Sequence, residues 1–307
     1  MEMAFLKKTG QVINLLASDL LQLKVGDRML SVSEYQEKYS VARGTIQNAL
    51  SYLKEVKGFK SKSRGQLGTF IEEIDYSILQ EYALSDTILG TMTLPYSLLY
   101  EGMATGIYEA FKENNILLNM AYIRGSKERV RSISNKTYRF AVISKFAANH
   151  AIENGEPIKI ITDFGAQTYL SEHIVLFSDK KKSQIEDGMK VAIDYSSTDQ
   201  QLLTKSVIGN KLVELVEMQG HQIIPSLRNG LIDAGVWNYD EIRDKNYQGI
   251  NYYPIKDNQV SQEMSTSVII IHKNDSTMEV FFSKSVDKKK ILEIQEQVCQ
   301  GKMIPQY

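Results

Sequence analysis

The sequence predicts an α/β protein with a small N-terminal domain made mainly of helices and a larger C-terminal domain in which strands and helices alternate. A chain of 307 residues is longer than one typical domain. Residues 1–71 have a net formal charge of +5, whereas the remainder has −6. The hydrophobic pattern also changes near residue 87. We therefore expect domains at 1–75 and 87–307, joined by a linker with some helix at 76–86.

Composition excludes several other classes of protein. The chain is 43% hydrophobic and 24% charged, which is typical of a folded globular protein and argues against disorder. Its single cysteine, Cys299, excludes an internal disulfide, and the four histidines lack the spacing of metal ligands. Apolar runs such as Val268–Ile271 are far shorter than the roughly 20 residues that span a bilayer. We therefore expect a cytoplasmic protein with no membrane segment, cofactor or metal.

The N-terminal elements follow from local patterns. Apolar residues predict a helix over Thr9–Leu23, and Ser31 with Glu34 three residues later forms a capping box that predicts a short helix over Val32–Tyr39. Ile46, Ala49, Leu50 and Leu53 lie at helical spacing and predict a third helix. After Gly58 the pattern predicts strand Phe59–Ser61, a basic turn over Lys62–Gly68 and strand Thr69–Ile71. This order predicts a helix-turn-helix followed by a wing.

The segment Gly26–Ile71 resembles the winged-helix domain of GntR-type transcriptional regulators. The residues that carry this resemblance are Gly26, Asp27, Ser31, Val41, Arg43, Thr45, Ala49, Leu50, Leu53, Gly58, Gly65, Gly68, Thr69 and Phe70. Positions 30, 33, 42, 47 and 48 depart from the family pattern, which affects the expected base preference.

The resemblance implies binding to double-stranded DNA. Arginine at the start of a recognition helix can pair with guanine in a bidentate manner, and a surface ion pair is the alternative role of Arg43. Wing cations are either phosphate contacts or solvated charges. The candidate DNA-binding residues are Ser33, Arg43, Gly44, Thr45, Gln47, Asn48, Lys60, Lys62, Arg64 and Gly65.

From Thr87 the chain alternates between strands and helices, which predicts parallel βαβ units arranged as two lobes around a cleft. Strands are expected at Thr87–Thr93, Ile116–Ile123, Arg139–Ile143, Ile158–Ile161, Ile174–Phe177, Lys190–Ile193, Lys211–Val216, Ala234–Trp237, Tyr252–Ile255 and Ser267–Ile271. Helices are expected at Leu98–Glu113, Lys127–Ser132, Lys145–Glu153, Asp199–Ile208 and Thr277–Gln300.

The order of these elements resembles the type II periplasmic solute-binding fold, which many bacterial regulators use as an effector domain. Two segments carry this resemblance, TMTLPYS at Thr91–Ser97 and IIPSLRNGLIDAGVWN at Ile223–Asn238. Together with the N-terminal domain, the chain most closely resembles the YhfZ family of GntR-like regulators.

Hydroxyl and basic residues follow several of the predicted strands, where helix N-termini offer free N–H groups to an anion. We expect a small ligand with a carboxylate or phosphoryl group, although serine and threonine are also ordinary helix caps. Trp237 is either ligand-facing or core, and Asp163 either binds an amine or caps a helix. The candidate ligand-binding residues are Thr91, Thr93, Arg124, Ser126, Ser144, Lys145, Ser196, Ser197, Thr198 and Trp237.

These observations predict a ligand-responsive transcriptional regulator that binds its operator as a homodimer. The sequence contains no GxSxG, GxGxxG or phosphate-loop motif, so we do not expect an enzyme. Two alternatives stay open at this stage. One is a DNA-binding architectural or interaction protein whose α/β domain has no ligand, and the other is an unrecognised enzyme in the α/β domain.

Overall fold

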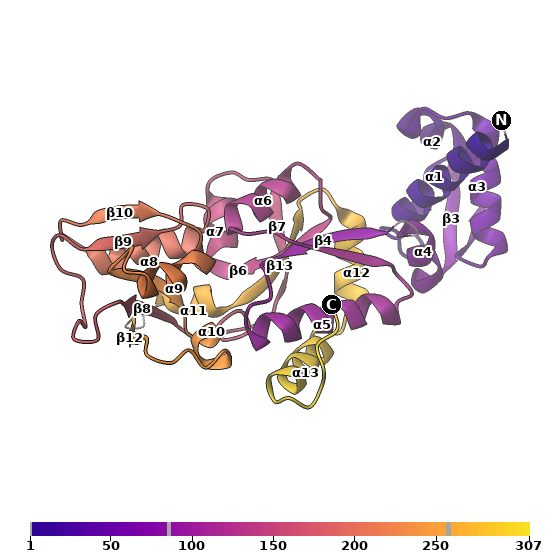
Figure 1. The fold of residues 1–307 in the computed structure, drawn as a ribbon. Helices are drawn as coiled ribbons and strands as arrows, with labels where there is room; N and C mark the ends of the chain where they lie inside the picture. Colours follow the sequence, from indigo (N-terminus) through magenta and orange to yellow (C-terminus); the bar gives the residue numbers. More distant parts are fainter. Residues whose placement is uncertain (1, 85–86, 256–258) are drawn as a thin grey trace. The chain divides into compact units, whose positions relative to one another are not determined.

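The computed structural model describes residues 2–84, 87–255 and 259–307 (Figure 1). Six residues of the predicted regions lie outside this described part: 85 and 86 of the linker, and 1 and 256–258 of the two domains. The chain divides into two compact units. Unit 1 comprises Met1–Ile88, Phe111–Leu118 and Asn274–Val286, and unit 2 comprises Leu89–Ala110, Asn119–Lys273 and Asp287–Tyr307.

Unit 1 contains a winged helix-turn-helix. Its elements are α1 (Glu2–Leu20), β1 (Arg28–Met29), α2 (Val32–Tyr39), α3 (Arg43–Glu55), β2 (Phe59–Ser63), the 3-10 turn η1 (Gly65–Leu67), β3 (Thr69–Ile74) and α4 (Tyr76–Ala83). The strands form a sheet in the order β1-β3-β2, with both pairings antiparallel. As the sequence predicts, Ser31 and Glu34 form a capping box: Ser31 Oγ accepts a hydrogen bond from the Glu34 amide, and Glu34 Oε2 accepts one from the Ser31 amide.

The core of unit 1 joins the helices to the wing. Leu16, Leu20, Ile46, Leu53 and Phe59 are buried together in one hydrophobic cluster. Their burial is the main driving force for this small domain, because each fully buried side chain of this size contributes about 1.5–3 kcal/mol.

Helix α12 (Ser276–Lys284) is far along the sequence but belongs to unit 1. Val280 packs against the hydrophobic cluster of this unit, and Lys284 Nζ lies 3.2 Å from the centroid of the Tyr76 ring. Phe281 makes an edge contact with Phe111. A late segment of the chain therefore completes the N-terminal unit.

Unit 2 contains two five-stranded sheets, each with helices (Figure 1). The first lobe has strand order β5-β4-β6-β13-β7 and the second lobe has order β10-β9-β11-β8-β12. First-lobe elements are β4 (Ile88–Met92), α5 (Leu98–Glu113), β5 (Leu118–Tyr122), α6 (Ser126–Ser134), β6 (Phe140–Ser144), α7 (Lys145–Glu153), β7 (Ile158–Asp163) and β13 (Ser267–His272). Second-lobe elements are β8 (His173–Phe177), β9 (Lys190–Ile193), α8 (Thr198–Ile208), β10 (Glu214–Glu217), η2 (Gly220–Gln222), α9 (Ile223–Arg228), β11 (Ala234–Asn238), α10 (Tyr239–Asp244) and β12 (Asn251–Pro254). Helix α11 (Gln259–Ser265) contacts α7 and β6 of the first lobe, and α13 (Lys288–Cys299) follows α12.

The structure corrects two details of the predicted α/β domain. The sheets are mixed rather than parallel, because β13 runs antiparallel to β6 and β7 and β8 runs antiparallel to β11 and β12. The predicted helix Thr277–Gln300 is two helices: α12 ends at Lys284, and Asp287 caps α13 by accepting a hydrogen bond from the Lys289 amide. No helix in the described part of the chain is long and apolar enough to cross a membrane.

Candidate functional site

Helix α3 presents a polar face outside the core of unit 1. Ile46, Ala49, Leu50 and Leu53 are buried on its inner side. Arg43, Gly44, Gln47 and Asn48 are exposed, and Thr45 is half-buried. Arg43 Nη1 is 3.4 Å from the exposed Ser33 Oγ on α2 and donates a hydrogen bond to it. The helical spacing therefore leaves a row of hydrogen-bonding side chains on the surface, at the helix that a helix-turn-helix places in the DNA major groove.

The wing carries the remaining predicted DNA-binding residues. Lys60, Lys62, Arg64 and Gly65 are all exposed. Lys60 Nζ lies 2.7 Å from a carboxylate oxygen of Glu73, but both side chains are largely in solvent, so this ion pair contributes little to stability. The Arg64 guanidinium lies 4.7 Å from the Phe70 ring centroid, a cation–π contact that restrains it beside the turn.

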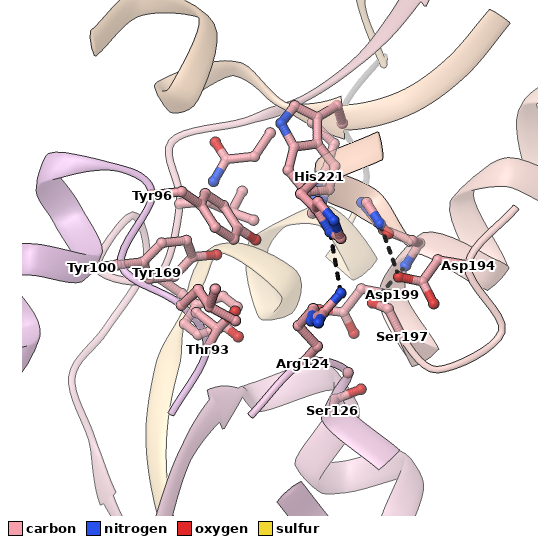
Figure 2. Close-up of a pocket in the computed structure, with 18 of the residues that line it drawn as sticks. Thr93, Tyr96, Tyr100, Arg124, Ser126, Tyr169, Asp194, Ser197, Asp199 and His221 are labelled. Carbon is pink, nitrogen blue, oxygen red and sulfur yellow. Dashed lines mark hydrogen bonds between the residues drawn. The ribbon is translucent and has the colours of Figure 1, made fainter. Parts of the chain in front are cut away.

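A second candidate site is a pocket formed by both lobes of unit 2 (Figure 2). Its cavity volume is about 90 Å³. Side chains from the first lobe, the second lobe and the segments that connect them line it. The lining residues are Thr93, Leu94, Tyr96, Tyr100, Arg124, Gly125, Ser126, Arg129, Tyr169, Leu170, His173, Asp194, Ser197, Asp199, Gln200, Gly220, His221, Trp237 and Asn238.

Arg124 and His221 face each other in this pocket. Figure 2 shows them joined by a hydrogen bond, with Asp194, Ser197 and Asp199 on one side and Tyr96, Tyr100 and Tyr169 on the other. Arg124 Nη1 is 3.4 Å from His221 Nδ1. Because arginine can only donate, this bond requires the neutral imidazole tautomer whose proton is on Nε2.

The two lobes contact each other directly beside the pocket, through a set of hydrogen bonds that we call the latch. Ser126 Oγ, at the start of α6, accepts a hydrogen bond from the Thr198 amide at 3.1 Å and donates one to Thr198 Oγ1 at 3.2 Å. The Lys127 amide donates to the Ser196 carbonyl, and Lys127 Nζ donates to Gln201 Oε1. Two hydroxyl-rich turns that the sequence singles out therefore meet, and they bond to each other.

Close packing at Gly125 makes the latch possible. Gly125 has φ +74°, and a Cβ atom at this position would lie 2.6 Å from Ser196 Oγ and 2.7 Å from the Ser196 carbonyl oxygen. Such distances are too short for any side chain, so the approach of the two lobes requires glycine here.

Arg129 is a buried cation at the pocket that the sequence analysis does not identify. It is only 3% exposed. Its Nη1 donates a hydrogen bond to the Ile123 carbonyl at 2.6 Å, and its Nη2 donates one to Tyr169 Oη at 3.0 Å. Its position three residues after Ser126, one turn into a helix, is the pattern that could have indicated that Arg129 points toward the same pocket.

Asp199 is a buried acid on the opposite lobe. Burial raises the pKa of its carboxyl from 3.8 to about 6, while a hydrogen bond with Ser144 and the Arg129 charge act in the other direction. Asp199 lies in the first turn of α8, where the helix dipole favours a negative charge. At neutral pH the pocket therefore contains a carboxylate close to a buried guanidinium.

Burial keeps one histidine and three tyrosines at the pocket neutral. Burial lowers the pKa of His173 to about 4, so its imidazole carries no proton charge at pH 7. Burial also raises the pKa of Tyr96, Tyr100 and Tyr169, so each phenol keeps its proton. The Tyr96 ring lies against the rings of Tyr100 and Trp237, so these three residues form an aromatic wall.

The predicted ligand-binding residues divide into two groups. Thr93, Arg124, Ser126, Ser197 and Trp237 line the pocket, and Trp237 is also a buried core residue whose Nε1 donates a hydrogen bond to Glu241. The remaining ones lie outside the lining: Thr91 and Ser144 are buried in the first lobe, Ser196 and Thr198 form the latch, and Lys145 is paired at 2.9 Å with Asp163. In the described part of the chain, no group of three or more His, Cys, Asp and Glu side chains could hold a metal ion.

Comparison with known proteins defines the class of each part. A family model described as a helix-turn-helix domain matches residues 24–71. The crystal structure of the periplasmic aliphatic sulphonate binding protein SsuA from Escherichia coli is similar to this chain with a TM-score of 0.51 and 12% identity, over 70% of this chain and 75% of that one. The protein thus combines a helix-turn-helix domain with an α/β domain of the periplasmic solute-binding fold.

The family follows from a second model. The model described as the YhfZ C-terminal domain matches residues 75–307, so the chain belongs to the YhfZ family. An uncharacterized YhfZ protein of Escherichia coli (strain K12) is 28% identical over 307 residues, which is the full length of both chains. The crystal structure of YhfZ from Shigella flexneri is similar with a TM-score of 0.61 and 27% identity, over 75% of this chain and 99% of that one. The family and the fold class predicted from sequence are confirmed.

Proposed function

We propose that this protein is a cytoplasmic transcriptional regulator that binds DNA as a homodimer and responds to a small ligand with an anionic group. The observation that carries the proposal is that one chain joins an exposed recognition helix to a pocket formed by two lobes. A ligand bound there contacts both lobes, so it stabilises the conformation in which they are close. The role is binding rather than catalysis, and the GntR-like character of the winged helix is part of the same proposal.

The DNA-binding half of the proposal is supported by charge as well as by fold. Residues 1–71 carry a net formal charge of +5, and residues 1–75 carry +2. Positive charge on a winged helix attracts the phosphate backbone, while the exposed polar face of α3 can read base edges.

Selection of bound sequences from a random double-stranded DNA pool tests this half. We expect enrichment of an inverted repeat, whose dissociation constant at a fixed salt concentration lies well below that of random DNA. If selection enriches no sequence above the starting pool, the protein is not a sequence-specific regulator.

The ligand-binding half is tested by melting the full chain against a panel of small carboxylates and phosphorylated metabolites. A compound that binds the folded state raises the melting temperature as its concentration exceeds the dissociation constant. Arg124→Ala should remove this shift, because Arg124 is the exposed cation of the pocket. Lys211→Ala, which removes an exposed cation elsewhere in the second lobe, is the control.

A further inference from the structure

The pocket contains acids as well as bases. Its charged lining side chains are Arg124, Arg129, Asp194 and Asp199. The two arginines belong to the first lobe and the two aspartates to the second. A ligand that is only an anion would be attracted by the first lobe but repelled by the second, where Asp199 is 6% exposed and has little water to screen it.

Buried polar atoms without a hydrogen-bond partner show the same division. Such atoms occur at several places in the described part of the chain, and three of them are at this pocket: Arg129 Nε and Asn238 Nδ2 are donors that lack an acceptor, and Asp199 Oδ1 is an acceptor that lacks a donor. All three residues line the pocket. Buried polar groups in folded proteins are almost always hydrogen-bonded, so unpartnered ones at a pocket indicate the groups that a ligand would supply.

Asp194 is less available than Asp199. Its Oδ1 accepts hydrogen bonds from the Ser196 amide and Ser196 Oγ, and its Oδ2 lies 3.3 Å from the Gly220 amide nitrogen. Asp194 therefore shapes its turn, and Asp199 is the acid with a free acceptor at the pocket.

We propose that the pocket binds a compact zwitterion of the amino acid type, with its carboxylate at Arg124 and its ammonium group at Asp199. This assignment rests on the proposed function, since it names the ligand class of the same pocket. The cavity of about 90 Å³ is well below the roughly 300–1,000 Å³ of sites for drug-sized ligands, which favours a compact ligand. The opposite charges of such a ligand would attract the two lobes simultaneously.

Calorimetric titration of the full chain with alanine and with two analogues that each lack one of its charged groups tests the proposal. The probes are alanine, as both enantiomers, propionate, which lacks the amine, and ethylamine, which lacks the carboxylate; glycine and β-alanine vary the length. We expect at least one zwitterion to bind at least tenfold more tightly than propionate and ethylamine. Propionate binding as tightly as every zwitterion, or no binding by any zwitterion, would overturn the proposal.

Two charge-removing variants separate recognition from folding. Asp199→Asn preserves the shape but removes the charge that faces the ammonium group, so alanine and propionate should bind this variant with similar affinity. Arg124→Gln should weaken both. Glu217→Gln, which removes an exposed acid on β10 of the same lobe, is the control and should bind as the parent does. If Asp199→Asn keeps the parent's preference for alanine over propionate, Asp199 does not recognise an amine and the proposal fails.

The outcome is distinguishable from failure of the proposed function. If a carboxylate without an amine binds and changes DNA affinity, the proposed regulatory function is supported and the zwitterion proposal is contradicted. If a zwitterion binds with the expected dependence on Asp199 but leaves DNA affinity unchanged, the ligand class is supported and the regulatory role is contradicted.

Discussion

At the scale of single residues, Arg43 is the best candidate for direct contact with a base. It lies at the first position of α3, is exposed, and donates a hydrogen bond to the exposed Ser33. Arg43→Ala should therefore weaken binding to the selected operator by about 1–3 kcal/mol and relax the preference at one base position. Arg131→Ala, an exposed arginine on α6, controls for the loss of one positive charge. An unchanged dissociation constant for Arg43→Ala would mean that another face of the domain reads the DNA.

Lys62 is expected to act differently from Arg43. It is exposed on the wing, and lysine interacts with phosphates as a point charge that carries no sequence information. Lys62→Ala should weaken binding to all sequences alike and reduce the dependence of log Kd on log salt by about one unit. A salt titration with operator and with random DNA measures both effects. A loss confined to the operator would instead indicate that Lys62 reads a base.

The lowered pKa of His173 predicts that acid destabilises the folded chain. Its pKa is about 4 in the folded chain against 6.5 for the free side chain, so the unfolded chain binds a proton between these values and the folded chain does not. The free energy of unfolding should therefore fall as the pH drops from 6.5 toward 4, by up to about 3 kcal/mol from this residue. Urea denaturation at several pH values should show a shallower fall in the free energy of unfolding for His173→Gln than for the parent.

The raised pKa of Asp199 predicts the opposite dependence of the free energy of unfolding on pH. Burial raises its pKa from 3.8 to about 6, so the folded chain binds the extra proton between these values. This residue favours folding at acid pH, and that contribution is lost as the pH rises through 6. The difference in free energy of unfolding between Asp199→Asn and the parent should shift in favour of the variant between pH 4 and pH 7.

At the scale of elements, the latch predicts a specific role for one glycine. Gly125→Ala places a methyl group against Ser196, so the lobes should no longer reach the arrangement seen here. The control is Gly155→Ala: Gly155 also has positive φ, at +83°, but a Cβ there meets nothing within 4 Å. Both variants should lose about 1–3 kcal/mol of stability through backbone strain. Only Gly125→Ala should weaken ligand binding, which calorimetry measures.

The sequence predicts most elements but not how they come together. Strands such as Ile174–Phe177 and Ala234–Trp237 are found where alternation indicates them. The direction of β13 is not predictable in this way, because it depends on the chain returning from the second lobe to the first. The pocket is more difficult to predict from the sequence than the strands are. Its residues Arg129, Asp199 and His173 come from distant segments, and they come close only when the lobes meet.

At the scale of the whole molecule, the proposed homodimer predicts the symmetry of the operator. A twofold protein dimer presents two equivalent recognition helices, so the half-sites should form an inverted repeat with a fixed separation. Light scattering at micromolar concentration should give twice the 34.9 kDa chain mass. Footprinting should show two equivalent half-sites. A monomer that protects one asymmetric site would contradict this arrangement.

Coupling between ligand and DNA is the property that makes the chain a regulator. Helix α5 begins two residues after Tyr96 of the pocket, and its last turn, from Phe111, belongs to the unit that contains the winged helix. A ligand that changes the DNA dissociation constant must, by reciprocity, have its own affinity changed by DNA to the same extent, typically by 1–3 kcal/mol. Titrating the ligand with and without operator, and the operator with and without ligand, should give equal factors. Arg124→Ala should bind the operator as the ligand-free parent does and show no response to ligand. Unequal factors would mean that the two titrations do not report one linked equilibrium. If both factors equal one, ligand binding in the pocket does not control DNA binding.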